Sequence, residues 1–171
     1  MIGLEAKLSH LEAGTAAPGF ELKTYEGQRI KLSELLQRGP VVVTFFKISC
    51  PVCQFTFPFL QRLHKRIGVN HASLIAISQD DARDTRDFCQ EFGADFPVLL
   101  DDSAYSVSNS YGITNVPTVF LIAPDGAIKV ECMGFDKAGL EKIATQVTAT
   151  AHLSAAPLFR PDEIVPAYKP G

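Results

Sequence analysis

A strand, a helix and a second strand follow one another between residues 41 and 78, and this order constrains the fold more than any other feature. Val41–Phe46 is β-branched or aromatic at every position, which is typical of a central strand covered on both faces. Ser73–Ser78 is a second apolar run. Between them, a spacing of three and four predicts a helix over Pro51–Ile67 with one buried face, made of Val52, Phe55, Phe59, Leu60, Leu63 and Ile67. This order favours parallel strands in an α/β fold.

The rest of the chain extends this pattern into a mixed sheet. The elements that we expect there are short strands at 20–22 and 30–32, a brief helix from Ser33 to Leu36 that Ser33 caps, a helix capped at Asp80 or Asp81, an extended piece at 96–100, a helix over 103–111, a hairpin of Thr118–Ile122 with 128–132, and a last helix capped by Asp136. We therefore predict a central mixed β-sheet, parallel at its start and antiparallel at its end, with helices on both faces.

The 171 residues fit one globular domain. Residues 1–19 end in a stretch of small residues, Pro and Gly, which favours an N-terminal arm, and residues 20–150 hold the packed elements. Residues 151–171 contain Pro157, Pro161, Pro166 and Pro170, which predict an extended tail. The apolar residues of this tail suggest that it docks on the domain, and they are Phe159, Ile164, Val165 and Tyr168.

Charge and hydropathy exclude several classes of partner. Sixteen Lys and Arg against nineteen Asp and Glu give a net charge of -3, so the basic excess that nucleic acid or an anionic membrane needs is absent. The longest apolar run, Val41–Phe46, is far short of the roughly 20 residues that span a bilayer. The first eight residues lack a basic start and an apolar core, so we expect a cytoplasmic protein unless a leader was removed.

Four cysteines are present, and two of them form the motif Cys50-Pro51-Val52-Cys53 between the predicted strand and helix. Unpaired backbone N–H groups at a helix N-terminus stabilise an anion, so a thiolate at Cys50 is favoured there. Pro51 in the first turn costs no hydrogen bond, and Cys53, one turn later, can close a disulfide with Cys50. Lys47, three residues before Cys50, could favour the thiolate further or be an ordinary exposed strand-end lysine.

At these residues the sequence resembles the thioredoxin superfamily, specifically the redoxin branch of thiol-disulfide reductases and thiol-specific antioxidant proteins. The resemblance covers roughly residues 18 to 148. It rests on the strand that leads into the cysteine pair, on Pro58, on Phe96-Pro97-Val98-Leu99-Leu100-Asp101, and on Tyr111-Gly112-Ile113-Thr114-Asn115-Val116-Pro117-Thr118-Val119-Phe120-Leu121-Ile122 followed by Pro124-Asp125-Gly126. It implies a thioredoxin-like α/β fold and a role in redox homeostasis.

The resemblance also implies roles for individual residues. Pro117 takes the position of a proline that is usually cis and faces the cysteine pair, and the backbone of Val116 would bind an extended substrate. Cys50 would attack a protein disulfide and Cys53 would resolve the mixed disulfide, with a reductant protein or thiol as second partner. Thr44 stands where thioredoxin has a buried Asp, so the proton acceptor for Cys53 stays open.

Other interpretations of the cysteines lead to different chemistry. A zinc site needs two more ligands, and the four histidines are scattered, so we expect neither a metal nor another cofactor. In a peroxiredoxin, Cys53 would be the peroxidatic residue, Cys50 would replace the family's threonine, and Val116 would stand in place of its Arg. A non-enzymatic redox-sensing module is a third possibility.

Residues outside the motif receive plainer predictions. Cys89 and Cys132 lie on apolar stripes, which predicts small core residues. His64 is predicted to be a solvated helix residue.

Overall fold

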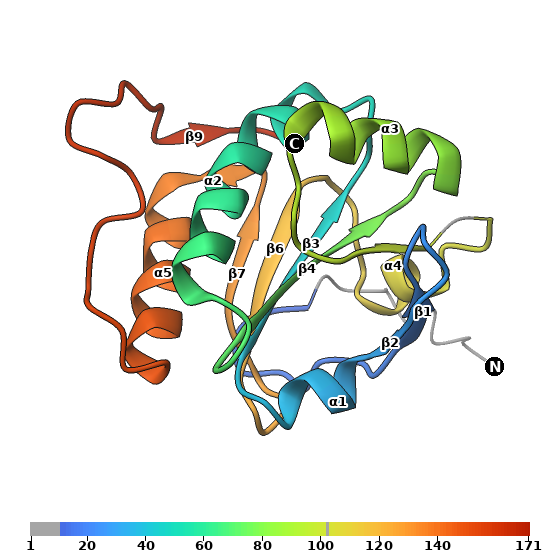
Figure 1. The fold of residues 1–171 in the computed structure, drawn as a ribbon, viewed down its shortest axis with the longest axis horizontal. Coiled ribbons are helices and arrows are strands. Elements are labelled where there is room, and N and C mark those ends of the chain that lie inside the picture. Colours follow the sequence, from blue (N-terminus) through green and yellow to red (C-terminus); the bar gives the residue numbers. More distant parts are fainter. Residues whose placement is uncertain (1–10, 102) are drawn as a thin grey trace, which may run out of the picture.

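Five strands form the central sheet in a computed structural model, which describes residues 11–101 and 103–171 (Figure 1). β4 (Ser73–Ser78) pairs in parallel with β3 (Val41–Phe46) and with β5 (Val98–Leu100). β6 (Thr118–Ile122) is antiparallel to both β3 and β7 (Ile128–Met133). The order is β5-β4-β3-β6-β7, so the predicted mixed sheet with β3 at its centre is confirmed.

Helices cover both faces of this sheet. α2 (Pro51–Ile67), α3 (Ala82–Phe92) and α5 (Lys137–Thr150) contribute to one hydrophobic cluster. α1 (Leu32–Leu36) and α4 (Ser106–Ser110) contribute to the cluster on the opposite face. The predicted placement of helices on both faces is confirmed.

Two short pairings complete the architecture. β1 (Glu21–Lys23) and β2 (Arg29–Lys31) form an antiparallel hairpin, as predicted within one residue. β8 (Phe135–Asp136) pairs with β9 (Tyr168–Lys169), which belongs to the tail. Within the described residues, no helix has both the length and the apolar character needed to cross a bilayer.

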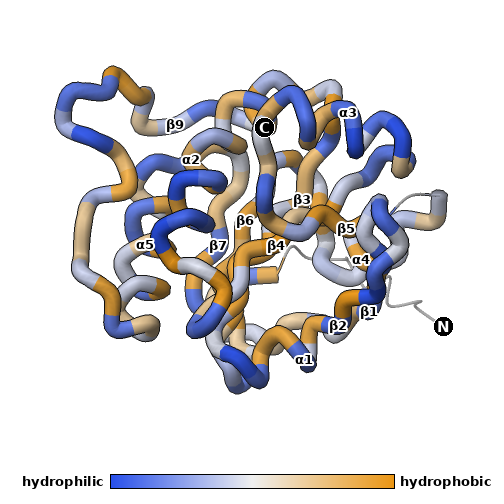
Figure 2. Tube along the Cα trace, viewed as in Figure 1, coloured by the Kyte–Doolittle hydropathy of each residue, from blue (hydrophilic) through white to orange (hydrophobic). Residues whose placement is uncertain are grey.

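The core follows from the alternation of side chains along β3. Val42 and Phe46 lie in the cluster under α2, whereas Val41, Val43 and Phe45 lie in the other cluster. All six residues of this strand are buried, as its composition predicts. Figure 2 shows the strands of the sheet mostly in the hydrophobic colour and α3 with long hydrophilic stretches.

The buried face of α2 differs from the predicted stripe. Phe57, outside the stripe, is only 1% exposed, because its ring packs against Phe46 and Phe88 at centroid distances of 4.6 and 4.8 Å. Phe55 and Phe59, inside the stripe, are only partly buried. Their rings pack against Phe135 of β8, at 4.9 and 5.8 Å between centroids. The helix buries a wider arc because α3 and the tail cover its flanks.

The helix ends confirm two predicted caps and correct one. The side chains of Asp81 and Asp136 accept backbone N–H groups at the starts of α3 and α5. Ser33 does not cap α1, because the helix follows β2 without a loop and its N-cap is Lys31, which makes no side-chain cap bond. The helix expected over 103–111 is also shorter, since α4 begins only at Ser106.

The tail contacts α2 and α5. Leu158 and Phe159 are buried, and the carboxylate of Glu141 on α5 accepts both of their N–H groups at 3.0 and 2.9 Å. Arg62 on α2 donates two hydrogen bonds to Glu163. The predicted docking of the tail is therefore confirmed at Phe159 and, in part, at Val165, whereas Ile164 and Tyr168, on which the prediction also rested, are exposed.

Some predictions about the chain ends stay predictions. The first ten residues of the predicted arm lie outside the described residues, and so does the segment behind the cytoplasmic expectation. The rest of the arm forms a bridge between Ala16 and Ala127, just before β7, and the N–H of Ile128 in β7 donates to the carbonyl of Thr15 at 2.8 Å. The hydroxyl of Tyr111 donates to the carbonyl of Pro18 at 2.8 Å. The domain boundaries at residues 19 and 150 are not tested by these contacts.

Candidate active site

Cys50 lies at the N-terminal end of α2, just after β3 has ended at Phe46. It is the N-cap residue, with an extended backbone at φ −87° and ψ 113°. Its Sγ accepts the backbone N–H of Cys53 at 3.2 Å. Pro51 occupies the first helical turn, where a missing N–H costs nothing. The sulfur of Cys50 thus receives one of the unpaired N–H groups of the helix, a contact that stabilises an anion.

The two cysteines of the motif have very different surroundings. Cys50 is partly exposed, whereas Cys53 is 0% exposed, and both are free thiols in this structure. Burial, followed by the hydrogen bond with Cys50, raises the pKa of the Cys53 thiol far above its usual value. Cys53 is therefore protonated at neutral pH, and Cys50 is the sulfur that a partner can reach.

The loop before β6 lies against Cys50. The Val116-Pro117 peptide bond is cis, as the resemblance implied. The thiol of Cys50 donates to the carbonyl oxygen of Val116 at 3.3 Å. The carbonyl of Pro117 accepts the N–H of Gly134 at 2.7 Å, which ties this loop to the end of β7. The structure thus brings together Cys50, Cys53, Val116 and Pro117. The hydrogen bond between Cys50 and Val116 joins residues that are 66 positions apart in the sequence.

Asp80 is a site residue that the sequence analysis assigned only as a possible helix cap. Asp81 caps α3, and the carboxylate of Asp80 instead accepts the N–H of Ile48 at 2.8 Å. The side chain of Gln54 donates to the carbonyl of Ile48 at 2.9 Å. Asp80 therefore positions the turn that carries Cys50. The available signal was that the parallel strands β3 and β4 end at the same edge of the sheet.

Lys47 meets the cysteine pair through its backbone, since a hydrogen bond with this backbone lowers the pKa of Cys53 against the larger effect of burial. Lys47 is exposed, and its backbone carbonyl accepts the N–H of Cys50 at 3.3 Å. Thr44 is fully buried, and its hydroxyl has no hydrogen-bond partner. It shares a face of β3 with Phe46, toward α2. A hydroxyl is no general base at neutral pH, so Thr44 does not replace a carboxylate as proton acceptor.

Two further cysteines belong to the core, as predicted. Cys89 and Cys132 are 3% and 1% exposed. Burial raises the pKa of Cys89 to about 11 and that of Cys132 to about 12, so neither is a reactive thiol.

The prediction for His64 is wrong. Its ring is half-buried, lies edge-on to Phe96 at 5.7 Å, and leaves Nδ1 without a partner. Burial lowers the pKa of His64, so the neutral form is favoured. The helix turns this position toward Phe96 rather than toward solvent.

Two other observations concern metals and pockets. Among residues 11–101 and 103–171, no group of three or more His, Cys, Asp and Glu side chains could hold a metal ion.

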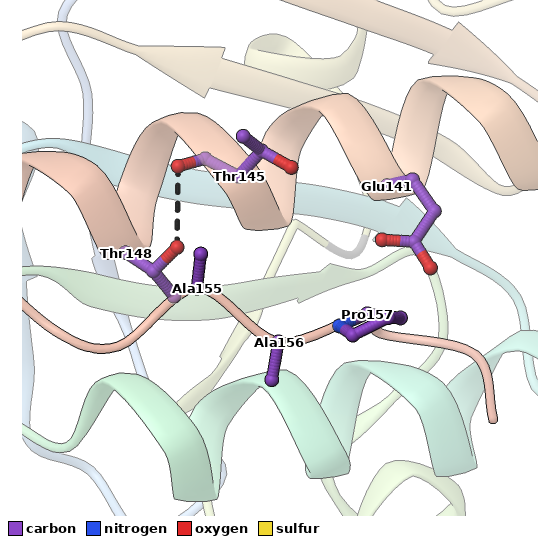
Figure 3. Close-up of a pocket in the computed structure, with 6 residues that line it drawn as sticks. All are labelled: Glu141, Thr145, Thr148, Ala155, Ala156 and Pro157. Carbon is purple, nitrogen blue, oxygen red and sulfur yellow. Dashed lines mark hydrogen bonds between the residues drawn. The ribbon is translucent and has the colours of Figure 1, made fainter.

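A pocket of about 350 Å³ lies between α5 and the tail, away from the cysteine pair (Figure 3). Its one carboxylate, from Glu141, already accepts two N–H groups of the tail.

Comparison with known sequences places this geometry in context. The model of the AhpC/TSA family matches residues 13–131. The thiol-disulfide oxidoreductase ResA of Bacillus subtilis is 30% identical over 119 residues, which are 69% of this chain and 65% of that protein. The protein of the same name from Halalkalibacterium halodurans is 31% identical over 139 residues, which cover 80% of this chain and 78% of that protein.

Solved structures show the same fold. A Chlorobium tepidum protein assigned as thiol:disulfide interchange protein DsbE has a TM-score of 0.73 and 27% identity, covering 82% of this chain and 99% of that one. Peroxidoxin BcpB of Mycobacterium tuberculosis has a TM-score of 0.68 and 26% identity, covering 84% and 97%. The neighbours thus include both a disulfide-exchange protein and a peroxidoxin.

Proposed function

Because the chain belongs to the AhpC/TSA family and is a thiol-disulfide oxidoreductase, we propose that Cys50 attacks the disulfide of a protein partner and that Cys53 resolves the mixed disulfide. The observation that carries this assignment is the difference between the two sulfurs. Cys50 is partly exposed and accepts an N–H at the start of α2, whereas Cys53 is fully buried with a raised pKa. Only Cys50 can meet a macromolecular substrate.

The exchange proceeds in two balanced steps. The Cys50 thiolate attacks one sulfur of the partner's disulfide, a Cys50–partner bond forms, and the released partner thiolate takes a proton. Cys53 then loses its proton and attacks the Cys50 sulfur, which releases the second partner thiolate. Two electrons have passed to the partner, and the Cys50–Cys53 disulfide remains. A dithiol reductant then reduces the Cys50–Cys53 disulfide to two thiols and is itself oxidised to a disulfide. The same steps run backwards when the partner has the lower potential.

Surrounding residues assist these steps. The backbone at Val116 offers hydrogen-bonding groups to an extended peptide beside the Cys50 sulfur, as in strand addition. Pro51 and Asp80 hold the turn that carries Cys50. Lys47, exposed before this turn, adds positive charge near a developing thiolate.

Peroxide reduction is the second candidate, favoured by the family match and by the likeness to a peroxidoxin. It requires Cys53 to be the attacking thiolate. The burial of Cys53 and its raised pKa oppose that role. Val116, at the position where the resemblance calls for an Arg, offers no positive charge to polarise a peroxide.

Two matched variants test the assignment. Cys53→Ser should trap covalent complexes with protein disulfides on non-reducing gels, because attack proceeds and resolution does not. Cys50→Ser is the control and should trap none. Peroxide added to Cys50→Ser, followed by a sulfenate-reactive probe, tests the second candidate. Rapid sulfenate formation at Cys53 together with an absence of trapped partners would overturn the proposal.

A further inference from the structure

The last residues of the tail reach the edge where the proposed substrate would bind. β9 pairs with β8, with Lys169 opposite Phe135 and Tyr168 opposite Asp136. Figure 1 shows β9 leading across the N-terminal end of α2. The side chain of Asn115 then donates to the carbonyl of Gly171 at 3.3 Å. Residues 168–171, which we call the strap, therefore connect β8 to the loop that precedes the cis proline.

Two glycines allow the strap to approach this closely. A Cβ atom on Gly171 would overlap the carbonyl oxygen of Val116 and lie 2.9 Å from its carbonyl carbon. A Cβ atom on Gly134 would overlap the carbonyl oxygen of Lys169 and lie 3.0 Å from the nitrogen of Gly171. Gly134 also has φ +70°, which other residues rarely adopt. The backbone of the strap thus lies directly on Val116, whose carbonyl oxygen accepts the thiol of Cys50.

The contacts that hold the strap are few. Lys169 places its ammonium 4.8 Å from the centroid of the Phe55 ring, and such a contact is weak at an exposed site. The strand pairing spans two residues on each side. Tyr168 is 56% exposed. The strap can therefore leave the surface without disturbing the core.

We propose that the strap covers the backbone edge at Val116 in the resting protein and must be displaced before a protein disulfide docks, so that it discriminates between macromolecular and small disulfides. This inference rests on the proposed function, because it takes Val116 as the docking edge. A peptide strand and residues 170–171 compete for the same backbone surface. A small disulfide needs only the sulfur of Cys50 and does not meet the strap.

Gly171→Val tests the proposal in the full chain, because its side chain cannot fit against Val116 and pushes the strap away. With insulin as the disulfide and dithiothreitol as reductant, the variant should lower KM by up to about tenfold at unchanged kcat, since apparent affinity scales with the fraction of molecules in the open state. The rate at which the pre-reduced protein, freed of dithiothreitol, reduces the small disulfide 5,5′-dithiobis(2-nitrobenzoate) in a single turnover should be unchanged. Lys169→Ala should give a smaller change in the same direction, and Ile164→Ala, at a fully exposed residue, is the matched control.

A second measurement tests whether the strap limits access to the site, and it does not depend on catalysis. Alkylation of reduced Cys50 by a polyethylene-glycol maleimide should be faster in Gly171→Val than in the wild type, whereas alkylation by iodoacetamide should be equal. Equal rates with the bulky reagent, or an insulin KM that stays constant or rises, would overturn the strap proposal. If the wild type reduces neither disulfide while the bulky reagent still distinguishes the variants, the proposed function fails, but the strap still covers the edge at Val116 against bulky molecules.

Discussion

The two halves of the tail are held to the same domain by different means. The inner half, residues 156–163, places Leu158 and Phe159 in the core and is fixed by charged side chains of α2 and α5. The outer half, residues 164–171, begins at the fully exposed Ile164, and only Val165 packs partly against the core. It is held mainly by backbone contacts, which are the two-residue pairing of β9 and the hydrogen bonds at Ala167 and Gly171, and by one cation–π contact. The comparison shows that the two ends of one extended segment can have different roles. One end stabilises the fold, and the other can control access to a site.

The largest effect is expected at Phe159 in the inner half. This residue is 4% exposed and packs on Phe59 and Phe135 with centroids 4.8 and 5.7 Å away. Phe159→Ala should reduce the free energy of unfolding by about 3–5 kcal/mol, because it leaves a cavity. Urea unfolding followed by circular dichroism measures it. Ile164→Ala should stay within about 0.5 kcal/mol of wild type, and equal losses would remove the comparison.

A smaller loss of stability is expected when the Glu141 carboxylate, which binds the backbone of the inner half, is removed. Glu141→Ala leaves the N–H groups of Leu158 and Phe159 without their acceptor. The loss in the free energy of unfolding should be about 1–3 kcal/mol, the usual result of unpairing buried polar groups. Glu141→Gln keeps an acceptor oxygen and should lose less. A Gln variant as unstable as the Ala variant would show that these hydrogen bonds contribute little.

The ion pair between Arg62 and Glu163 makes the inner half sensitive to pH. The hydrogen bonds from Arg62 lower the pKa of Glu163 from 4.5 to about 2. The pair therefore stabilises the fold fully above the unfolded-state pKa and loses this contribution as pH falls from about 4.5 toward 2. Solvent reaches the pair, so its effect should be below that of Glu141→Ala.

Urea unfolding at pH 6 and near pH 3 measures the sensitivity, with Glu163→Gln as the matched variant. The wild type should lose more stability than the variant between these values. Parallel losses would mean that the pair contributes nothing.

The smallest change in stability is expected in the outer half. Lys169→Ala removes the contact with the Phe55 ring and should cost no more than about 0.5–1 kcal/mol. Thermal unfolding measures it, and Lys169→Arg, which keeps a cation over the ring, should lie between the variant and wild type. A loss as large as that of Phe159→Ala would show that the outer half is anchored as firmly as the inner half.

Elements with long, regular patterns were predictable to the residue. β3, α2 and β4 have the predicted bounds because β-branched runs and a three-and-four spacing leave few alternatives. The cap of α1 was not predictable from Ser33, because the direct passage from β2 into the helix sets its start at Leu32. Phe57 was missed because its burial depends on α3, whose position the pattern of α2 does not contain.

The site was predictable as far as the motifs reach. Cys50 and Cys53 follow from their place between strand and helix, and Val116 and Pro117 from the resemblance. The role of Asp80 and the strap were not predictable, because each joins segments far apart in the sequence: 32 residues separate Ile48 from Asp80, and 56 separate Asn115 from Gly171. Neither contact leaves a local pattern.

The closeness of Gly171 to Val116 has a practical consequence for any fusion protein made from this chain. An affinity tag or fluorescent reporter joined after Gly171 would emerge beside the Cys50 sulfur and stand in the path of an approaching substrate. Kinetic constants from such a fusion would describe the tag as much as the enzyme. Reporters are better inserted at the turn of Asp125 and Gly126 between β6 and β7, which lies at the end of the sheet opposite Cys50.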